Sequence, residues 1–415
     1  MDIFRFSTYQ AECIDMEQQR VRKTYHYKLK PTSEQERALE LVLARCRTLY
    51  NVALEQRRMW WGRGQGNSAS YYQQAMELPD LKAACPEYGE VHSQVLQDVL
   101  RRVDKTYQAF FRRIANGETP GYPRFQGANR YHSVTYPQYG NGAVLDGSVL
   151  SLSRIARIPI RLHRSLHGTP KTVTISREAD GWYASCSCAD VPTESLPSTK
   201  RETGIDVGLK VFLITADGKI IENPRHYRTA EKQLAKAQRR IARRKKGSER
   251  RKKAGALLKR KHQKVQRQRR DFHHKMALAL LHTYDTIYLE DLQVRNMVRN
   301  RHLAKSISDA SWGQFRTILA FKAACAGKRV FAIPPAFTSQ DCSGCGERVP
   351  KSLSVRTHVC PNCGLVIDRD ENAALNILRA GPRLVFFGFM PTSQTRSIEQ
   401  PAVHKMRCGL SGDGW

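Results

Sequence analysis

Four cysteines near the C-terminal end of the chain form a metal-binding pattern. They make two Cys-x-x-Cys pairs, Cys342 with Cys345 and Cys360 with Cys363, separated by fourteen residues. A glycine follows each pair, which predicts a tight turn that directs two thiolates to one point. Four thiolates close a tetrahedral shell, so we predict a structural Zn²⁺ site; iron in a rubredoxin-like site is the alternative. A segment this short cannot build its own core, so metal binding would supply folding energy.

A second set of chemically capable residues consists of carboxylates. Asp206 lies within an apolar strand pattern, where acids are unusual, and Glu290 ends another strand. Asp368 and Asp370 lie between the cysteines and a helix. Each acid alone is typical of an exposed or capping carboxylate. Three that converge in a basic protein could hold two Mg²⁺ ions, about 3.5–4 Å apart, which activate water and stabilise the leaving oxygen in phosphodiester hydrolysis.

The stretch 232–270 is the strongest compositional feature. It holds 19 Lys or Arg against one acid, Glu249, and so supplies +18 of the net charge of +31. A sparse apolar stripe interrupted at Gly247 and Ser248 predicts two basic helices joined by a turn. Such a run is often a solvated helical hairpin, but this charge density favours contact with phosphates. The candidate contacts, taken as a group, are Arg239, Arg240, Arg243, Arg244, Lys245 and Lys246.

Composition sets wider limits on the function. The 415 residues, with 69 Lys or Arg and 38 Asp or Glu, favour a polyanion as partner, with nucleic acid ahead of a membrane surface. Apolar runs of about seven residues are too short to cross a membrane. The N-terminus has no secretory pattern, and eleven cysteines with two Cys-x-x-Cys pairs favour metal ligation over disulfides. We therefore expect a cytoplasmic protein.

The pattern of elements changes along the chain. A strand is predicted at 24–30, with Ser33 and Glu36 as a capping box for the helix that follows. A second helix opens near Ser93, and short strands with Asp-Gly turns then predict a small barrel up to about 191. Cys186 and Cys188 in the last of these strands are expected to be core or surface thiols. Mixed α/β structure follows, with a strand at 204–215, helices at 272–284, 307–326 and about 371–379, and strands at 286–289 and 329–333.

Four segments together carry a resemblance to a known family. They are 204–210 (GIDVGLK), 289–292 (LEDL), 306–313 (SISDASWG) and 368–377 (DRDENAALNI). With the four cysteines, they resemble TnpB, the insertion-sequence-encoded protein related to type V CRISPR effectors, over roughly 21–380.

The resemblance implies an α+β multidomain fold: a RuvC-like nuclease domain of RNase H fold with a zinc-ribbon insertion, preceded by a wedge-type β-barrel with an inserted helical recognition domain. The family's three catalytic acids map onto Asp206, Glu290 and Asp370, the last chosen over Asp368 because it lies two residues before Asn372. The expected divisions are a leader (1–20), barrel (21–32 and 116–191), helical domain (33–115), linker (192–202), nuclease domain (203–337 and 367–380), zinc ribbon (338–366) and poorly ordered tail (381–415).

The function that the resemblance implies is an RNA-guided, Mg²⁺-dependent endonuclease of a transposable element. Its partners would be a guide RNA and double-stranded target DNA in a prokaryotic nucleoid, and cleavage would occur beside a short adjacent motif. Two alternatives remain: an RNA-guided regulator that does not cut, and a DNA-strand transferase. The sequence identifies neither the adjacent motif nor the residues that read it.

Overall fold

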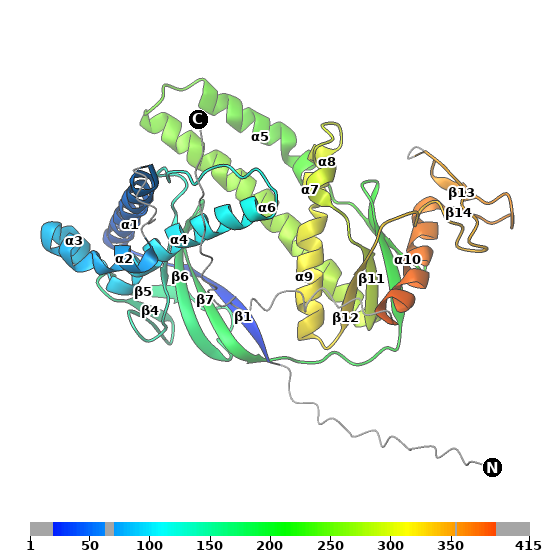
Figure 1. The fold of residues 1–415 in the computed structure, drawn as a ribbon, viewed down its shortest axis with the longest axis horizontal. Coiled ribbons are helices and arrows are strands. Elements are labelled where there is room, and N and C mark those ends of the chain that lie inside the picture. The colour runs from blue at the N-terminus through cyan, green and yellow to red at the C-terminus, as the bar shows by residue number, and fades with distance from the viewer. Residues whose placement is uncertain (1–19, 63–69, 353–354, 387–415) are drawn as a thin grey trace, which may run out of the picture. The chain divides into compact units, whose positions relative to one another are not determined.

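A computed structural model describes residues 20–62, 70–352 and 355–386. The chain divides after Thr193 into two compact units, each with its own sheet (Figure 1). The predicted leader (1–20) and tail (381–415) lie outside the described residues, except for Arg20 and 381–386. Among the described residues, no helix combines the length and the apolar character that a membrane crossing needs.

The sheet of the first unit has seven antiparallel strands in the order β2-β6-β7-β1-β5-β4-β3. The edge strands β2 and β3 follow each other in sequence, so the short connection 137–142 joins the two edges and the sheet is a nearly closed barrel. The strands are β1 (Arg20–Leu29), β2 (Ser133–Tyr136), β3 (Ala143–Asp146), β4 (Val149–Leu152), β5 (Ala156–Arg161), β6 (Thr169–Glu178) and β7 (Gly181–Pro192).

The barrel core follows the predicted alternation. Tyr25, Tyr27 and Leu29 on β1 are buried, because successive side chains of a strand point to opposite faces. Cys186 and Cys188 on β7 are buried in the same core, so of the two predicted alternatives, core or surface thiols, the structure shows the first.

Helices are inserted between β1 and β2. The predicted long helices are α1 (Ser33–Gly62) and α4 (Ser93–Ala115); α2 (Tyr71–Met76), α3 (Leu78–Ala84) and the 3₁₀ helix η1 (Pro86–Glu90) were not predicted, being too short to show a period. The predicted capping box is wrong by one residue. Thr32 accepts from the backbone N–H of Gln35, whose side chain accepts from the N–H of Thr32, so the reciprocal pair is Thr32 and Gln35 rather than Ser33 and Glu36.

The sheet of the second unit has five strands in the order β10-β9-β8-β11-β12, with β8, β11 and β12 parallel. They are β8 (Glu202–Val207), β9 (Val211–Thr215), β10 (Ile220–Glu222), β11 (Thr286–Glu290) and β12 (Arg329–Ile333). The single strand predicted at 204–215 is wrong, because the chain turns at 208–210 and β8 and β9 pair as a hairpin. At this turn the N–H of Gly208 donates to the carbonyl of Phe212, 3.2 Å away.

Helices pack on both faces of this sheet. Ile205, Ile287 and Leu289 belong to the core formed with helices α6 and α9, whereas Tyr288 lies in a separate core with Ile377 of α10. The helices are α5 (His226–Ala242), α6 (Glu249–Thr283), α7 (Val294–Met297), α8 (Ala304–Ala310), α9 (Trp312–Cys325) and α10 (Arg369–Phe386); a small hairpin, β13 (Thr357–Val359) and β14 (Val366–Asp368), precedes α10.

Three predicted helix bounds are corrected. The helix predicted at 272–284 is the continuation of basic α6, since no proline or glycine interrupts the chain after Gly255. The helix predicted at 307–326 is divided at Ser311, whose backbone is left-handed (φ 55°). The last helix continues past 379 into the predicted tail, because Gly381 packs against the ring of Tyr288, where a Cβ would lie 2.3 Å from a ring carbon.

Candidate metal centres

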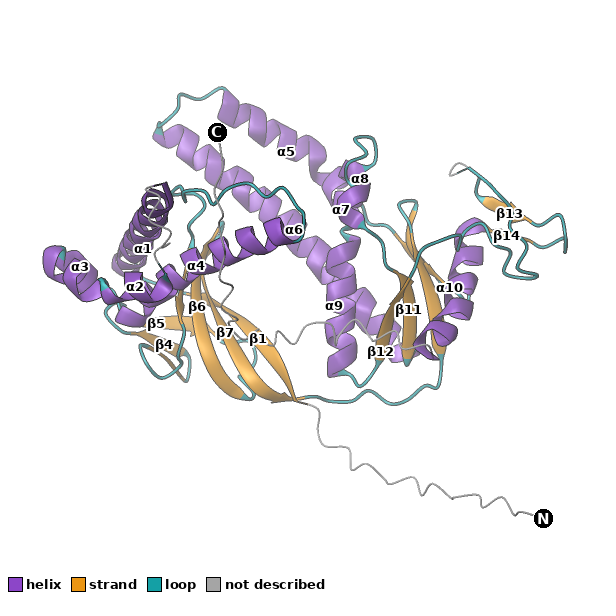
Figure 2. Ribbon diagram, viewed as in Figure 1, coloured by secondary structure: helices purple, strands orange, loops and turns teal. Residues whose placement is uncertain are grey.

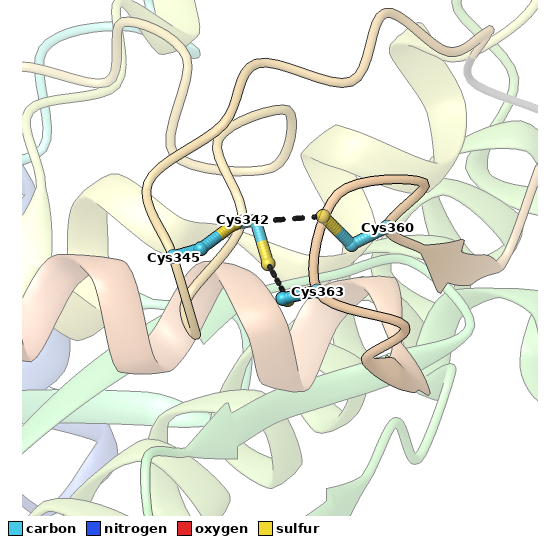
Figure 3. Close-up of side chains that lie close together, drawn as sticks. All are labelled: Cys342, Cys345, Cys360 and Cys363. Carbon is cyan, nitrogen blue, oxygen red and sulfur yellow. Dashed lines mark hydrogen bonds between the residues drawn. The ribbon is translucent and has the colours of Figure 1, made fainter.

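The four predicted cysteines converge on one point (Figure 3). Their sulfurs all lie within 4.8 Å of one another, and the Cys342–Cys363 and Cys345–Cys360 pairs are each 3.6 Å apart. A tetrahedral zinc ion with Zn–S bonds of about 2.3 Å needs sulfurs about 3.8 Å apart. The described cysteines therefore fit the metal site of a zinc ribbon, as the spacing predicted.

Each Cys-x-x-Cys pair is closed by backbone bonds. The N–H of Gly346 donates to the carbonyl of Cys342 (2.9 Å), and that of Gly364 to the carbonyl of Cys360 (3.0 Å). Both glycines have left-handed backbones, φ 85° and 73°, which a side chain would strain. Burial opposes ionisation of Cys342, but N–H groups of the turn outweigh it and lower the pKa of this thiol. The first turn thus favours the thiolate form of Cys342. At Cys363 a backbone N–H lowers the pKa, but burial and the neighbouring thiols outweigh it and raise the pKa to about 12 in the absence of a metal ion.

The strands bring two predicted acids side by side. Gly204 and Ile205 of β8 pair in parallel register with Tyr288 and Leu289 of β11. One residue further along each strand lie Asp206 and Glu290. Since Ile205 and Leu289 face the α6 and α9 core, alternation turns both acids toward the opposite face, on which α10 packs.

Helix α10 carries the third predicted acid to the same edge. Gly204 allows a close approach, because a Cβ there would lie 2.1 Å from the carbonyl oxygen of Ala374. Asp370 occupies the first turn of the helix, and one of its oxygens lies 3.8 Å from the position of a Cβ on Gly208. The structure therefore brings Asp206, Glu290 and Asp370 together at the carboxyl ends of β8 and β11; we call them the carboxylate cluster.

The charges of the other two acids act on Asp206. Although part of the Asp206 side chain still meets solvent, burial of its carboxyl raises its pKa well above the ordinary 3.8, and the charges of Glu290 and Asp370 raise it further. Burial also raises the pKa of Glu290, against the opposing hydrogen bond from Thr338. Burial thus disfavours the ionised forms of Asp206 and Glu290. A divalent cation, which carboxylate oxygens suit, would offset this cost.

Asp368 and Asp370 have different surroundings. Asp368 accepts from the N–H groups of Asp370 (2.8 Å) and Glu371 (3.4 Å), which makes it the N-cap of α10. Asp370 instead forms ion pairs with Arg356 (3.0 Å) and Arg369 (2.8 Å). Its oxygens do not converge with those of the other two acids as closely as the cysteine sulfurs converge with one another.

The predicted basic helices form a hairpin, α5 and α6, which lie side by side (Figure 2). Of the six predicted phosphate contacts, Arg239, Arg240, Arg243, Lys245 and Lys246 are exposed at the end of this hairpin. Arg244 is half-buried and donates to the carbonyl of Arg250 (2.7 Å), so its guanidinium already binds the connecting turn to α6. The exposed group has few acids nearby and forms a strongly positive surface.

Several polar residues near these sites belong to no motif or spacing pattern in the sequence and were therefore not predicted. Asp309, 7% exposed, accepts from the first N–H groups of α5 and pairs with Arg269 of α6 (3.2 Å), so it fixes the basic hairpin to α8. Thr338, Asn372 and Asn376 form hydrogen bonds between the first cysteine turn, the segment before it and the carboxylate cluster. Only the three-dimensional contacts reveal these roles, since isolated Thr, Asn and Asp residues are common in loops and helix ends.

Comparison with known proteins gives consistent matches. The sequence model of the OrfB_IS605 family, described as "Probable transposase", matches residues 185–301, and those described as "Cas12f1-like, TNB domain" and "Helix-turn-helix domain" match residues 312–377 and 16–66.

A "Putative RNA-guided DNA endonuclease" of Streptomyces pristinaespiralis is 37% identical over 88% of this chain and 90% of its own length. A "Putative RNA-guided DNA endonuclease InsQ" of Escherichia coli (strain K12) is 30% identical over 91% of this chain and 97% of its own. Among solved structures, the Cas12f1 chain in a complex with sgRNA and target DNA has a TM-score of 0.55 at 12% identity, covering 86% of this chain and 98% of that one, which shows a similar fold.

Proposed function

This chain belongs to the OrfB (TnpB) family of insertion-sequence proteins, whose relatives include named RNA-guided DNA endonucleases, and we propose that it is such an endonuclease. Its partners are a guide RNA and double-stranded target DNA, and it cuts the DNA beside a short adjacent motif at the nucleoid of a prokaryotic cell. The observation that carries the proposal is the convergence of three carboxylates in a family member with a net charge of +31.

The second unit is, in this proposal, a RuvC-like nuclease domain of RNase H fold. Its sheet supports this assignment, because a three-stranded antiparallel part (β10-β9-β8) is extended by two parallel strands. The acids occupy the carboxyl ends of β8 and β11, where ligands of open α/β sheets bind.

Asp206, Glu290 and Asp370 would hold Mg²⁺, whose chemistry when bound is to activate a water and stabilise the leaving 3′ oxygen of a phosphodiester. Glu290 is held by the hydroxyl of Thr338. The backbone around Gly204 and Gly208 lets α10 approach the strands closely enough to bring Asp370 to the other two acids. The cysteine cluster is closed, so we assign it a structural zinc ion without a catalytic role.

The exposed basic residues of the α5–α6 hairpin would bind the phosphate backbone of the nucleic acids. Binding should therefore weaken steeply between about 50 and 200 mM salt. Replacing Arg239, Arg240 and Arg243 together with alanine should flatten the dependence of log affinity on log salt, by up to about 0.9 for each lost phosphate contact on duplex DNA.

The test starts from protein expressed with its native downstream DNA and purified in high salt. Sequencing of the co-purified RNA should give one discrete species that ends in sequence flanking the element. A plasmid that carries the matching target and a library of adjacent motifs should then be cut by the wild type and by D146N, a control at an exposed barrel residue, but not by D206A. Heterogeneous RNA would overturn guided recognition. Discrete RNA without cutting would indicate a regulator, and joining of a free 3′ end a strand transferase.

A further inference from the structure

One segment of the second unit contacts both metal centres. It runs from Thr338 to Ser343, directly after the loop that follows β12, and includes the first zinc-ribbon ligand, Cys342; we call it the linking segment. Thr338, only 9% exposed, donates its hydroxyl proton to Glu290 Oε1. Five residues later, Ser343 lies inside the first Cys-x-x-Cys turn. The predicted zinc ligand Cys342 and Thr338, which supports a predicted catalytic acid, are therefore only four residues apart in the chain.

Two asparagines of α10 fix this segment to the helix. Asn372, fully buried, accepts from the N–H of Ser343 (2.9 Å) and donates to the carbonyl of Asp341 (2.8 Å). Asn376 donates to the carbonyls of Thr338 (2.9 Å) and Asp341 (2.6 Å). Being four residues apart, the two amides lie on the same face of the helix.

Hydrogen bonds hold the linking segment at both ends, to Glu290 through Thr338 and to α10 through the two asparagines. The amide of Asn372 finds its partners only while the first cysteine turn is folded, and an unpaired buried amide is costly. The same helix begins at the carboxylate cluster, with Asp370 two residues before Asn372. A shift of the cysteine turn would therefore be transmitted to Asp370 through α10 and to Glu290 through Thr338.

We propose that the linking segment couples the cysteine cluster to the carboxylate cluster, with Thr338 as a positioning residue for Glu290 and with Asn372 and Asn376 as the residues that hold the segment to α10. The zinc ribbon is then part of the support of the acidic site as well as a separately folded insertion. The inference rests on the proposed function in one respect, that the carboxylates bind a divalent cation.

The experiment measures Mn²⁺ binding to the full chain without nucleic acid, from the electron paramagnetic resonance signal of free Mn²⁺, together with the zinc content of each variant. T338V keeps the size of the side chain but removes the hydroxyl, and T338S keeps the hydroxyl. We expect T338V to weaken Mn²⁺ binding about 10-fold at unchanged zinc content, as loss of a group that orients a metal ligand typically does. T338S should bind within about 2-fold of the wild type, since its hydroxyl can orient the same ligand.

The other end of the coupling is tested at Asn376, which is half-buried and tolerates substitution better than Asn372. N376D is almost isosteric, but its carboxylate cannot donate to the two carbonyls. It should lose zinc faster to a chelator and also bind Mn²⁺ more weakly, while R383A, an exposed change on the same helix, should alter neither. Wild-type protein stripped of zinc and dialysed should show the same weakened Mn²⁺ binding.

The outcomes separate this inference from the proposed function. If D206A binds Mn²⁺ as the wild type does, the carboxylate cluster is not the cation site and the proposed function fails. If D206A loses binding while T338V, N376D and zinc-stripped protein keep it, the coupling is overturned. Thermal unfolding of each variant identifies a misfolded T338V, in which case N376D and the zinc-stripped wild type decide the question.

Discussion

The cysteine cluster and the carboxylate cluster are assembled in opposite ways. The cysteines come from two short turns of one segment, and their sulfurs already lie at the separation that a tetrahedral ion requires. The carboxylates come from β8, β11 and α10, more than 160 residues apart in sequence at the extremes, and their charges oppose their own assembly. Local turn geometry builds the first centre, whereas the packing of a whole domain builds the second.

The difference predicts opposite consequences for stability. A closed thiolate site gains its folding energy from the ion, so the ion holds the ribbon together. A buried group of like charges costs folding energy until a cation binds, so the domain must be stable enough to hold Asp206 and Glu290 in place. Functional sites often carry such a cost, which the surrounding core offsets.

The largest expected effect is at the cysteines. C360S removes a buried ligand and should release zinc; the lost binding energy is on the order of 10 kcal/mol for a structural site. Residues 342–352 and 355–364 should then lose their protection from hydrogen exchange. C85S, at a half-buried cysteine of the helical module, is the matched control and should keep the full zinc content. A C360S protein that retains zinc would mean that the cysteines do not form the site.

Removal of a carboxylate from the cluster should lower activity without lowering stability. E290Q keeps the shape of the side chain but removes the charge that a cation needs, so the cleavage rate should fall about 1,000-fold, equivalent to about 4 kcal/mol. Its zinc content and unfolding temperature should not fall. Cleavage within 10-fold of the wild type would remove Glu290 from the catalytic set.

A third measurement compares the thermal stability of the metal-free wild type with that of D206N. The folded-state pKa of Asp206 is raised, so the neutral carboxyl costs no stability below the unfolded pKa. The free energy of unfolding then falls as the pH rises through the folded pKa and the carboxyl ionises. D206N should therefore raise the unfolding temperature of the metal-free protein at pH 7, and the advantage should shrink as the pH falls. Added Mg²⁺ should stabilise the wild type but not D206N. If D206N unfolds at a lower temperature than the wild type at pH 7, the charge of Asp206 does not oppose folding.

The cysteine cluster and several turns elsewhere in the chain were readable from sequence because their causes are local, whereas the β13–β14 hairpin beside the cysteines was not predicted. The Cys-x-x-Cys turns, the Asp-Gly hairpins and the break near Gly247 depend on a few neighbouring residues, and the structure contains them. The acids were singled out by type and by family resemblance, but their convergence depends on register. Only the pairing of β8 with β11 shows that Asp206 and Glu290 face α10.

The errors have the opposite origin. The last helix was expected to end at about 379, yet it continues through Gly381, where contact with Tyr288 makes the small residue necessary. Thr338 and Asn376 have no local signature, since their partners are backbone atoms and a carboxylate brought there by the fold. Tertiary contacts of this kind override local propensity.

The smallest expected effect separates two neighbouring aspartates. Asp368 caps α10 through the N–H groups of Asp370 and Glu371, so D368A should lower the free energy of unfolding by about 1 kcal/mol, while D368N, which keeps an accepting oxygen, should lose less. Because Asp368 serves the helix end, cleavage by D368A at saturating Mg²⁺ should stay within a few-fold of the wild type, whereas D370N should fall as far as E290Q. Chemical denaturation and cleavage rates of the three variants measure both quantities. The reverse pattern, with D368A inactive and D370N active, would move the third acid of the carboxylate cluster to Asp368, and α10 would then contribute its cap rather than its first turn to the cation site.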